Sequence, residues 1–258
     1  MASYETITYE SSGGVGTITL NRPERLNGIT NRMMFDLYDV LLGLPTDHQT
    51  RVVVLTGAGK GFCPGADLQH YTSGAGEAPL SPEHFQLTAM LHELPQVTVA
   101  AINGACAGAG LGWAAACDLR YATASANFNS AFLGVGISGD MAGPWLLPRI
   151  VGAGRAREMM LLHGKFDTAR AEALGFVNGV FPDETFRADV DAIVRRLAKS
   201  APLALRGMKQ NFIAGESLSL REYIRIESER HQRTGASEDS RAAFRAFVEK
   251  REPEFKGR

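Results

Sequence analysis

The chain has 258 residues, of which 45% are hydrophobic and 21% are charged, and its formal net charge is −1. This balance is typical of a globular protein with a sizeable core, and it excludes a disordered or collagen-like chain. No block of lysine and arginine indicates a nucleic-acid partner, and no stretch is apolar enough to predict a membrane span. Three cysteines without metal-ligand spacing predict reduced thiols and no metal site, and the N-terminus does not resemble a signal peptide, so we expect a cytoplasmic protein.

The hydropathy pattern of the first half predicts alternating strands and helices. Residues 4–20 alternate as a β-hairpin would, with Gly13 and Gly14 at the turn. In chain order we then expect a helix over 33–44, a strand over 52–55, a loop over 71–82, a helix over 82–94, a strand over 97–102, a helix over 111–117 and a strand over 119–122. This order indicates a mixed α/β fold with right-handed crossovers.

The second half, from Gly143 onward, is predicted to be mostly helical. We expect helices over 155–163, 186–199, 202–214 and 238–250, a helix from Asp167 to Gly175, and a short extended piece over 176–181. We divide the chain into a core, residues 1–195, and a C-terminal helical region, residues 196–258. This helical region packs either on a core of its own or on a neighbouring subunit.

Two glycine- and alanine-rich segments, residues 57–68 and 103–112, are the most informative feature of the chain. Each follows a predicted buried strand and leads into a predicted helix. Turns with almost no side chains can bring two backbone N–H groups close to one ligand oxygen, which is what an oxyanion hole requires. Taken singly, such a turn is more often a packing device or a phosphate-binding loop.

Both segments closely resemble motifs of the enoyl-CoA hydratase/isomerase (crotonase) superfamily. The resemblance is carried by residues 61–68 (GFCPGADL) and 101–110 (AINGACAGAG), and it extends in the same order to residues 20–23, 117–122, 147–152 and 247–257. It implies a spiral of ββα units with a C-terminal helical trimerisation region, assembled as a homotrimer or a dimer of trimers. It also implies an acyl-CoA thioester as substrate and no separate cofactor, because CoA is part of the substrate.

The resemblance also assigns candidate site residues. It gives the oxyanion donors as the backbone N–H groups of Ala66 and Ala109, the second at a position where the superfamily usually has glycine. Further substrate or CoA contacts are expected at Arg25, Leu26, Gly65, Asp67, Leu68, Gly108, Gly110, Phe132, Phe247 and Lys250. Asp67 also fits a helix cap. The C-terminal pair also fits an ordinary amphipathic helix, or a contact made from a neighbouring subunit.

The carboxylates around the oxyanion hole decide which reaction the enzyme catalyses. Hydratases of the superfamily use two glutamates, and the matching positions here are Gly112 and Phe132, which can supply neither the base nor the acid that hydration needs. Asp140 matches the aspartate of isomerase-type members and of the chlorobenzoyl-CoA dehalogenases. Its apolar neighbours would raise its pKa, which suits a group that moves a proton between two carbons. Asp140 also fits the N-cap of a helix that starts at residue 141.

We therefore expect an acyl-CoA isomerase in which Ala66 and Ala109 stabilise a thioester enolate and Asp140 shuttles the proton. Hydration, hydrolysis or C–C cleavage with Asp140 activating water stays open as an alternative. A non-catalytic acyl-CoA-binding protein is the alternative of another class. The identity of the acyl group does not follow from the sequence.

Overall fold

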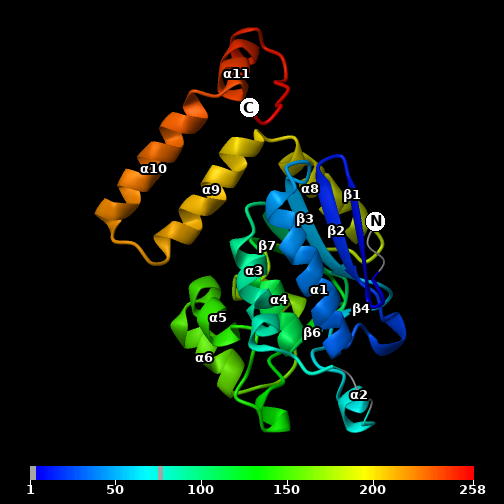
Figure 1. Ribbon diagram of the computed structural model, residues 1–258. Coiled ribbons are helices and arrows are strands. Elements are labelled where there is room, and N and C mark those ends of the chain that lie inside the picture. Colours follow the sequence, from blue (N-terminus) through cyan, green and yellow to red (C-terminus); the bar gives the residue numbers. More distant parts are fainter. Residues whose placement is uncertain (1–3, 75–77) are drawn as a thin grey trace.

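The computed structural model describes residues 4–74 and 78–258, and its centre is a six-stranded sheet in the order β1-β2-β3-β5-β7-β10 (Figure 1). The strands are β1 (Ile7–Ser12), β2 (Val15–Leu20), β3 (Val52–Gly57), β5 (Val97–Ile102), β7 (Leu119–Thr123) and β10 (Gly179–Phe181). The first two form the predicted antiparallel hairpin, with Ser12 opposite Val15, and the other neighbours pair in parallel. The predicted strands at 52–55, 97–102 and 119–122 are confirmed.

A second, smaller sheet runs in the order β4-β6-β8-β9. Its strands are β4 (Gly61–Cys63), β6 (Ala105–Ala107), β8 (Asn127–Asn129) and β9 (Phe166–Asp167). Successive units send one strand into each sheet, as β3 with β4, β5 with β6 and β7 with β8, so the ββα spiral is confirmed. The two glycine-rich segments are therefore not plain strand-to-helix turns. None of the four strands of this smaller sheet was predicted, because each has only two or three residues, too few for an alternating apolar pattern.

Helices cover both faces of the larger sheet. In chain order the helices up to residue 198 are α1 (Asn31–Gly43), α2 (Leu68–Thr72), α3 (Leu87–Glu93), α4 (Ala109–Ala116), α5 (Gly143–Val151), α6 (Ala153–Leu161), α7 (Thr168–Ala173) and α8 (Phe186–Ala198). The helix predicted over 82–94 begins as a 3₁₀ turn (Pro82–Gln86). The loop predicted over 71–82 overlaps the end of α2, and residues 75–77 lie outside the described residues. Asp167 caps α7 as predicted, by accepting a hydrogen bond from the Arg170 amide, although that helix ends at Ala173.

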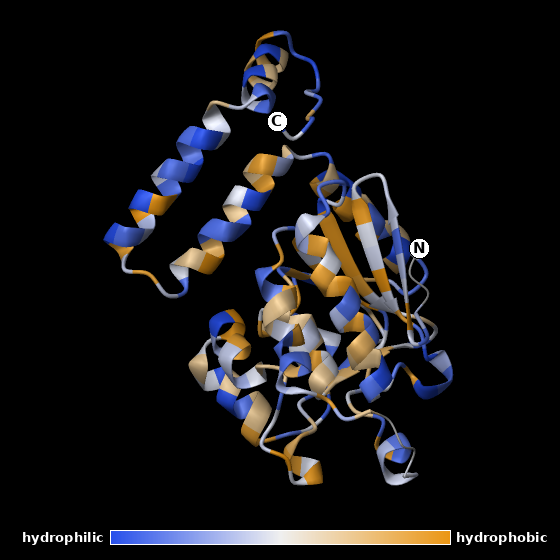
Figure 2. Cartoon of the chain, in the orientation of Figure 1, coloured by the Kyte–Doolittle hydropathy of each residue, from blue (hydrophilic) through white to orange (hydrophobic). Residues whose placement is uncertain are grey.

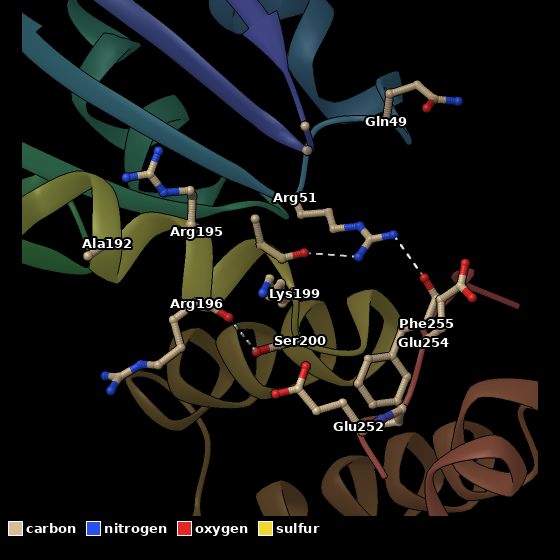
Figure 3. Close-up of a pocket in the computed structure, with 14 residues that line it drawn as sticks. Gln49, Arg51, Ala192, Arg195, Arg196, Lys199, Ser200, Glu252, Glu254 and Phe255 are labelled. Atoms are coloured by element: carbon tan, nitrogen blue, oxygen red, sulfur yellow. Dashed lines mark hydrogen bonds between the residues drawn. The ribbon is translucent and has the colours of Figure 1, made fainter. Parts of the chain in front are cut away.

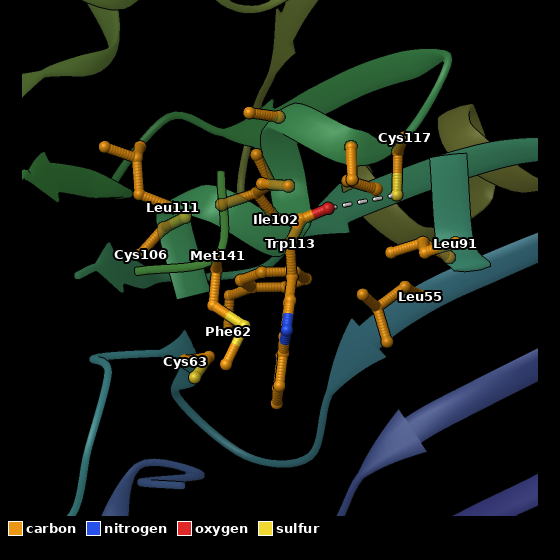
Figure 4. Packing of buried hydrophobic residues seen from close by; sticks show 14 of the residues in the cluster. Leu55, Phe62, Cys63, Leu91, Ile102, Cys106, Leu111, Trp113, Cys117 and Met141 are labelled. Atoms are coloured by element: carbon orange, nitrogen blue, oxygen red, sulfur yellow. Dashed lines mark hydrogen bonds between the residues drawn. The ribbon is translucent and has the colours of Figure 1, made fainter. Parts of the chain in front are cut away.

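The core is divided by the sheet, because successive side chains of a strand point to opposite faces. Val53 and Leu55 of β3 belong to the main cluster with the apolar faces of α1, α3 and α4, part of which is drawn in Figure 4. Val52 and Val54 belong to a second cluster with the apolar face of α8. Strand β3 is accordingly apolar along most of its length and is orange in Figure 2, whereas the β1–β2 hairpin is largely pale.

The C-terminal helices α9 (Pro202–Gly215), α10 (Leu220–Gly235) and α11 (Glu238–Val248) extend away from these layers (Figure 1). Helix α10 was not predicted, because its sequence is strongly polar overall and the helix buries none of its residues. The capping box of Ser219 and Glu222 at its start was the signal that could have found it. The division proposed between residues 195 and 196 falls inside α8. In the described part of the chain, no helix has the length and apolarity that a membrane crossing requires.

Candidate active site

The two glycine-rich segments lie against each other, with their backbones in close contact. A methyl group placed on Gly65 would lie 3.2 Å from the Ala107 carbonyl oxygen and 3.5 Å from the Ala109 nitrogen. Gly65 and Gly108 have φ angles of +96° and +51°, which a side chain would strain. Glycine at these two positions therefore permits both the turns and the close approach. The structure brings Ala66 and Ala109 together, although they are about forty positions apart.

Both predicted oxyanion donors have free amides. The Ile29 amide donates to the Gly65 carbonyl at 2.9 Å and the Ile29 carbonyl accepts from the Asp67 amide at 2.9 Å, so the Ala66 N–H faces away from this pairing. Ala109 is the first residue of α4, where an amide has no partner within the helix. Within residues 4–74 and 78–258, neither amide has an acceptor. Ala109 belongs to the buried core, and its N–H remains available despite the methyl group.

An asparagine that the sequence analysis did not single out ties the two segments together. The Asn103 side chain accepts a hydrogen bond from the Gly57 amide at 3.0 Å and donates to the Gly59 carbonyl at 3.0 Å. Asn27, which is fully buried, donates to the Gly61 carbonyl at 2.7 Å. These amide side chains satisfy backbone groups that the turns leave unpaired. A polar residue directly after a buried strand, as Asn103 is after β5, was the available signal.

Asp140 lies in the segment before α5, and it does not cap that helix. The N-cap position is Ala142, without a side-chain hydrogen bond, so the cap alternative is wrong. In the described part of the chain, the Oδ1 atom of Asp140 is buried and has no hydrogen-bond partner. Burial raises the pKa of the Asp140 carboxyl, because the charged form loses water, and a hydrogen bond from its own backbone amide opposes this only in part. Met141 and Ala142 both have positive φ, at 47° and 55°, so the backbone beside Asp140 is held in a costly conformation.

The two positions expected for hydratase glutamates lie beside this segment. A methyl group placed on Gly112 would lie 2.5 Å from the Met141 carbonyl oxygen and 2.6 Å from the Met141 Cβ, so the chain after Asp140 occupies the space of a side chain there. The Phe132 ring lies between the two parts of the site. Its Cε1 atom is 3.9 Å from the β-position of Gly108, and its Cδ2 atom is 3.7 Å from that of Gly139. No carboxylate from position 112 or 132 faces Asp140.

Thiol chemistry at the site is excluded by burial. Cys63, Cys106 and Cys117 are free and buried (Figure 4). Burial raises the pKa of the Cys63 thiol, the one nearest the turn at Gly65, to about 12. A thiol with such a pKa stays protonated near neutral pH and is a poor nucleophile.

The residues predicted to contact CoA from the N-terminal half gather next to Ala66. Asp67 caps α2 as expected by accepting from the His70 amide at 3.0 Å, and it pairs with Arg22 at 3.0 Å and Arg25 at 3.3 Å. Leu26 and Leu68 are exposed. A side chain at Gly110 would overlap the Cys63 carbonyl, so glycine permits close packing here, and its contact with the substrate stays a prediction.

Phe247 and Lys250 are not brought to this group within one chain. Phe247 lies on α11 and is 85% exposed, and Figure 1 shows α11 at the opposite end of the molecule from α2. Lys250 follows the end of that helix. Their expected contact with CoA therefore stays a prediction that requires a neighbouring subunit.

A hollow of about 1070 Å³ lies at the other end of the sheet (Figure 3). It is enclosed by the β1–β2 turn, α8 and the C-terminal tail, where Arg51 donates to the carbonyls of Ala198 at 2.9 Å and Phe255 at 3.0 Å. Arg51 directly precedes β3, whereas the first glycine-rich segment follows the end of that strand. This hollow contains none of the candidate catalytic residues.

The fold and the paired turns agree with the comparison with known sequences. A sequence model of the family described as enoyl-CoA hydratase/isomerase matches residues 10–258. The chain belongs to this family. It is an acyl-CoA-processing enzyme of the crotonase superfamily.

Relatives of this chain carry different activities in their names. The chain is 37% identical to 1,2-epoxyphenylacetyl-CoA isomerase of Escherichia coli (strain K12), over 95% of this chain and 96% of that protein. It is 37% identical to a probable enoyl-CoA hydratase of Rhodobacter capsulatus, over 99% and 100% of the two chains. A 4-chlorobenzoyl coenzyme A dehalogenase of an Arthrobacter species is 36% identical over 80% of this chain and 77% of its own length. The relatives therefore show the family without deciding the reaction.

A solved structure supports the crotonase fold over nearly the full length. A putative enoyl-CoA hydratase/isomerase from Mycobacterium abscessus superimposes with a TM-score of 0.88 at 34% identity, covering 98% of this chain and 100% of that one.

Proposed function

We propose that this enzyme is an acyl-CoA isomerase that moves a proton between two carbons of a thioester enolate. The observation that carries the proposal is the buried Oδ1 atom of Asp140, which has no hydrogen-bond partner among the described residues. The Phe132 ring lies near Gly139, the residue before Asp140, and near Gly108, the residue before Ala109. A partly buried carboxylate with a raised pKa is a competent base near neutral pH.

The proposed reaction uses one base and two donors. For a 3-enoyl thioester, Asp140 takes a proton from C2, and the electron pair of that C–H bond moves into a dienolate whose negative charge rests on the thioester oxygen. The N–H groups of Ala66 and Ala109 bind this oxygen, and each such donor is worth about 3 kcal/mol in transition-state stabilisation. The protonated Asp140 then returns the proton to C4, which gives the 2-enoyl thioester. The carboxylate is regenerated, and no atom is gained or lost.

Hydration is the less favoured reaction because it requires a second acid or base. In hydration, a base must deprotonate the water that adds to one carbon, and an acid must protonate the neighbouring carbon. Position 112 is a glycine packed against Met141, and position 132 is a phenylalanine, so Asp140 would have to perform both tasks.

The deciding experiment compares the native enzyme with Asp140→Asn on 3-enoyl-, epoxyphenylacetyl- and aryl-CoA thioesters in deuterated water. We expect an isomer of the substrate that has gained no oxygen and keeps its CoA, with the moved hydrogen retained except where Asp140 exchanges its proton with the solvent. We expect the Asp140→Asn enzyme to be slower by a factor of about 10² to 10⁴. Product mass spectrometry gives the readout. A product that has gained water, or has lost its CoA, would replace isomerisation by hydration or hydrolysis. Binding of every thioester without turnover would support the non-catalytic alternative.

A further inference from the structure

An apolar cavity of about 360 Å³ adjoins the candidate site. It is formed by residues 132–138 together with helices α5 and α6. Apart from Ser138 and Arg157, its lining residues are apolar, and none of them is acidic. A cavity of this kind takes an apolar group and adds a few polar contacts at its edge.

The cavity is separated from the thioester site by a single ring. Phe132 lines the cavity on one side and lies 3.9 Å from the β-position of Gly108 on the other. Met160, a second wall of the cavity, lies with its methyl group 3.8 Å from the β-position of Gly139, the residue before Asp140. An acyl group whose thioester oxygen is held by Ala66 and Ala109 would thus pass Asp140 and Phe132 before it reaches the cavity.

Arg157 places an unpaired positive charge at this cavity. Arg157 is exposed on α6, and in the described ranges, 4–74 and 78–258, it has no acidic partner. The acidic residue that follows it, Glu158, pairs with Arg170 at 3.0 Å. A guanidinium group binds carboxylates through two parallel hydrogen bonds, and apolar surroundings strengthen such a pair.

We propose that this cavity is the subsite for the distal end of the acyl group, and that Arg157 selects acyl groups which end in a carboxylate. The preferred substrates are then CoA monothioesters of dicarboxylic acids, with the chain or ring between the two carboxyl groups lying against Phe132 and Met160. The subsite rests on the proposed function only in that the thioester must occupy the oxyanion hole.

The test measures binding and not turnover, so that it does not depend on the reaction. Isothermal titration compares saturated thioesters in matched pairs: adipoyl-CoA with hexanoyl-CoA, suberoyl-CoA with octanoyl-CoA, and sebacoyl-CoA with decanoyl-CoA. We expect the native enzyme to bind at least one dicarboxylic thioester about fivefold more tightly than its methyl-ended counterpart, as a surface ion pair worth about 1 kcal/mol would give. Arg157→Gln should lose this preference while its affinity for the methyl-ended thioesters stays within about twofold.

Arg155→Gln is the matched control, because Arg155 is an exposed arginine of the same helix that does not line the cavity. It should keep the native preference. A preference that survives Arg157→Gln, or no preference in any pair, would overturn the subsite while leaving the proposed function intact. Failure of every thioester to bind would overturn both. A change of oligomeric state in Arg157→Gln, without a change of preference, would assign the cavity to a contact between copies and overturn the subsite as well.

Discussion

The partial burial of the Asp140 carboxyl makes its contribution to stability depend on pH. Because burial raises its pKa in the folded protein, folding favours the protonated form. The stability that this group contributes is present in full below the unfolded pKa, and it is lost as the pH rises through the raised folded value. The base required for proton transfer is the charged form, so activity and stability oppose each other at this residue.

This opposition predicts two pH effects. The ratio kcat/KM of the native enzyme should rise with pH through a pKa above the ordinary aspartate value of about 3.9. Asp140→Asn should unfold at a higher temperature than the native enzyme at neutral pH, on the order of 2 °C, because it removes the buried charge. That gain should disappear near pH 4. Rate profiles and thermal melts between about pH 4 and pH 8 measure both. A gain that is equal across this range would contradict the role of charge.

Gly112 is predicted to be a packing position that tolerates no side chain. Gly112→Ala forces a methyl group within 2.6 Å of Met141, so we expect a loss of about 1–3 kcal/mol in the free energy of unfolding. Gly154→Ala is the control, because nothing lies within 4 Å of its β-position, and it should change stability by less than about 1 kcal/mol. Urea unfolding compares the two variants. Equal stability of the two variants would mean that Met141 and its neighbours move aside at little cost, and it would contradict this prediction.

The helix α9 is joined to the sheet by a buried charge rather than by apolar packing. Lys209 is its one buried residue, and its ammonium group lies 2.8 Å from the Asp118 carboxylate and 2.9 Å from the Gln96 carbonyl. Burial lowers the pKa of Lys209, and the charge of Asp118 opposes this effect. Asp118 also accepts hydrogen bonds from the amide and hydroxyl groups of Thr98. The start of β5 and the C-terminal helices therefore share one polar network.

Removing the lysine should loosen this attachment. Lys209→Met leaves Asp118 without its cation, and since Asp118 keeps its bonds to Thr98 we expect a loss of about 1–3 kcal/mol in stability. Hydrogen exchange should show increased opening in α9 and β5, with the oxyanion segments little changed. Lys199→Met, at an exposed lysine after α8, is the control. A loss confined to global stability, without local opening in α9, would contradict the docking role.

The C-terminal helices expose a large amount of apolar surface for their size. Phe212, Leu220, Phe244, Phe247 and Val248 are each between 69% and 85% exposed. Extended patches of this kind mark protein–protein contacts. They are compatible with the homotrimer or dimer of trimers that the family resemblance implies, which stays a prediction.

Charge on this surface should therefore disrupt assembly. We expect the native enzyme to have three or six times the mass of one chain in light scattering, and the double variant Phe212→Glu, Phe247→Glu to have the mass of one chain or to form smaller assemblies. Leu42→Glu, at a 54% exposed leucine of α1, should keep the native mass. A native enzyme that is monomeric at micromolar concentration would refute the assembly.

The sequence predicted most of the fold because the apolar periodicity of the strands and of α1 and α8 is local and strong. It did not predict the strands of the smaller sheet or α10. These strands have only two or three residues each, and α10 is polar and buries none of its residues, so neither shows a strong local apolar pattern.

The glycine-rich motifs and their order along the chain were by themselves enough to assign the family, since they encode backbone geometry that few other residues permit. The sequence also left Asp140 as the one acidic candidate, because positions 112 and 132 carry no carboxylate. Only the tertiary structure decided which groups meet. It placed the Ala66 and Ala109 amides side by side, excluded Asp140 as a helix cap, and left Phe247 and Lys250 far from the site of their own chain. These outcomes depend on contacts between segments that are distant in sequence, and local propensity does not predict such contacts.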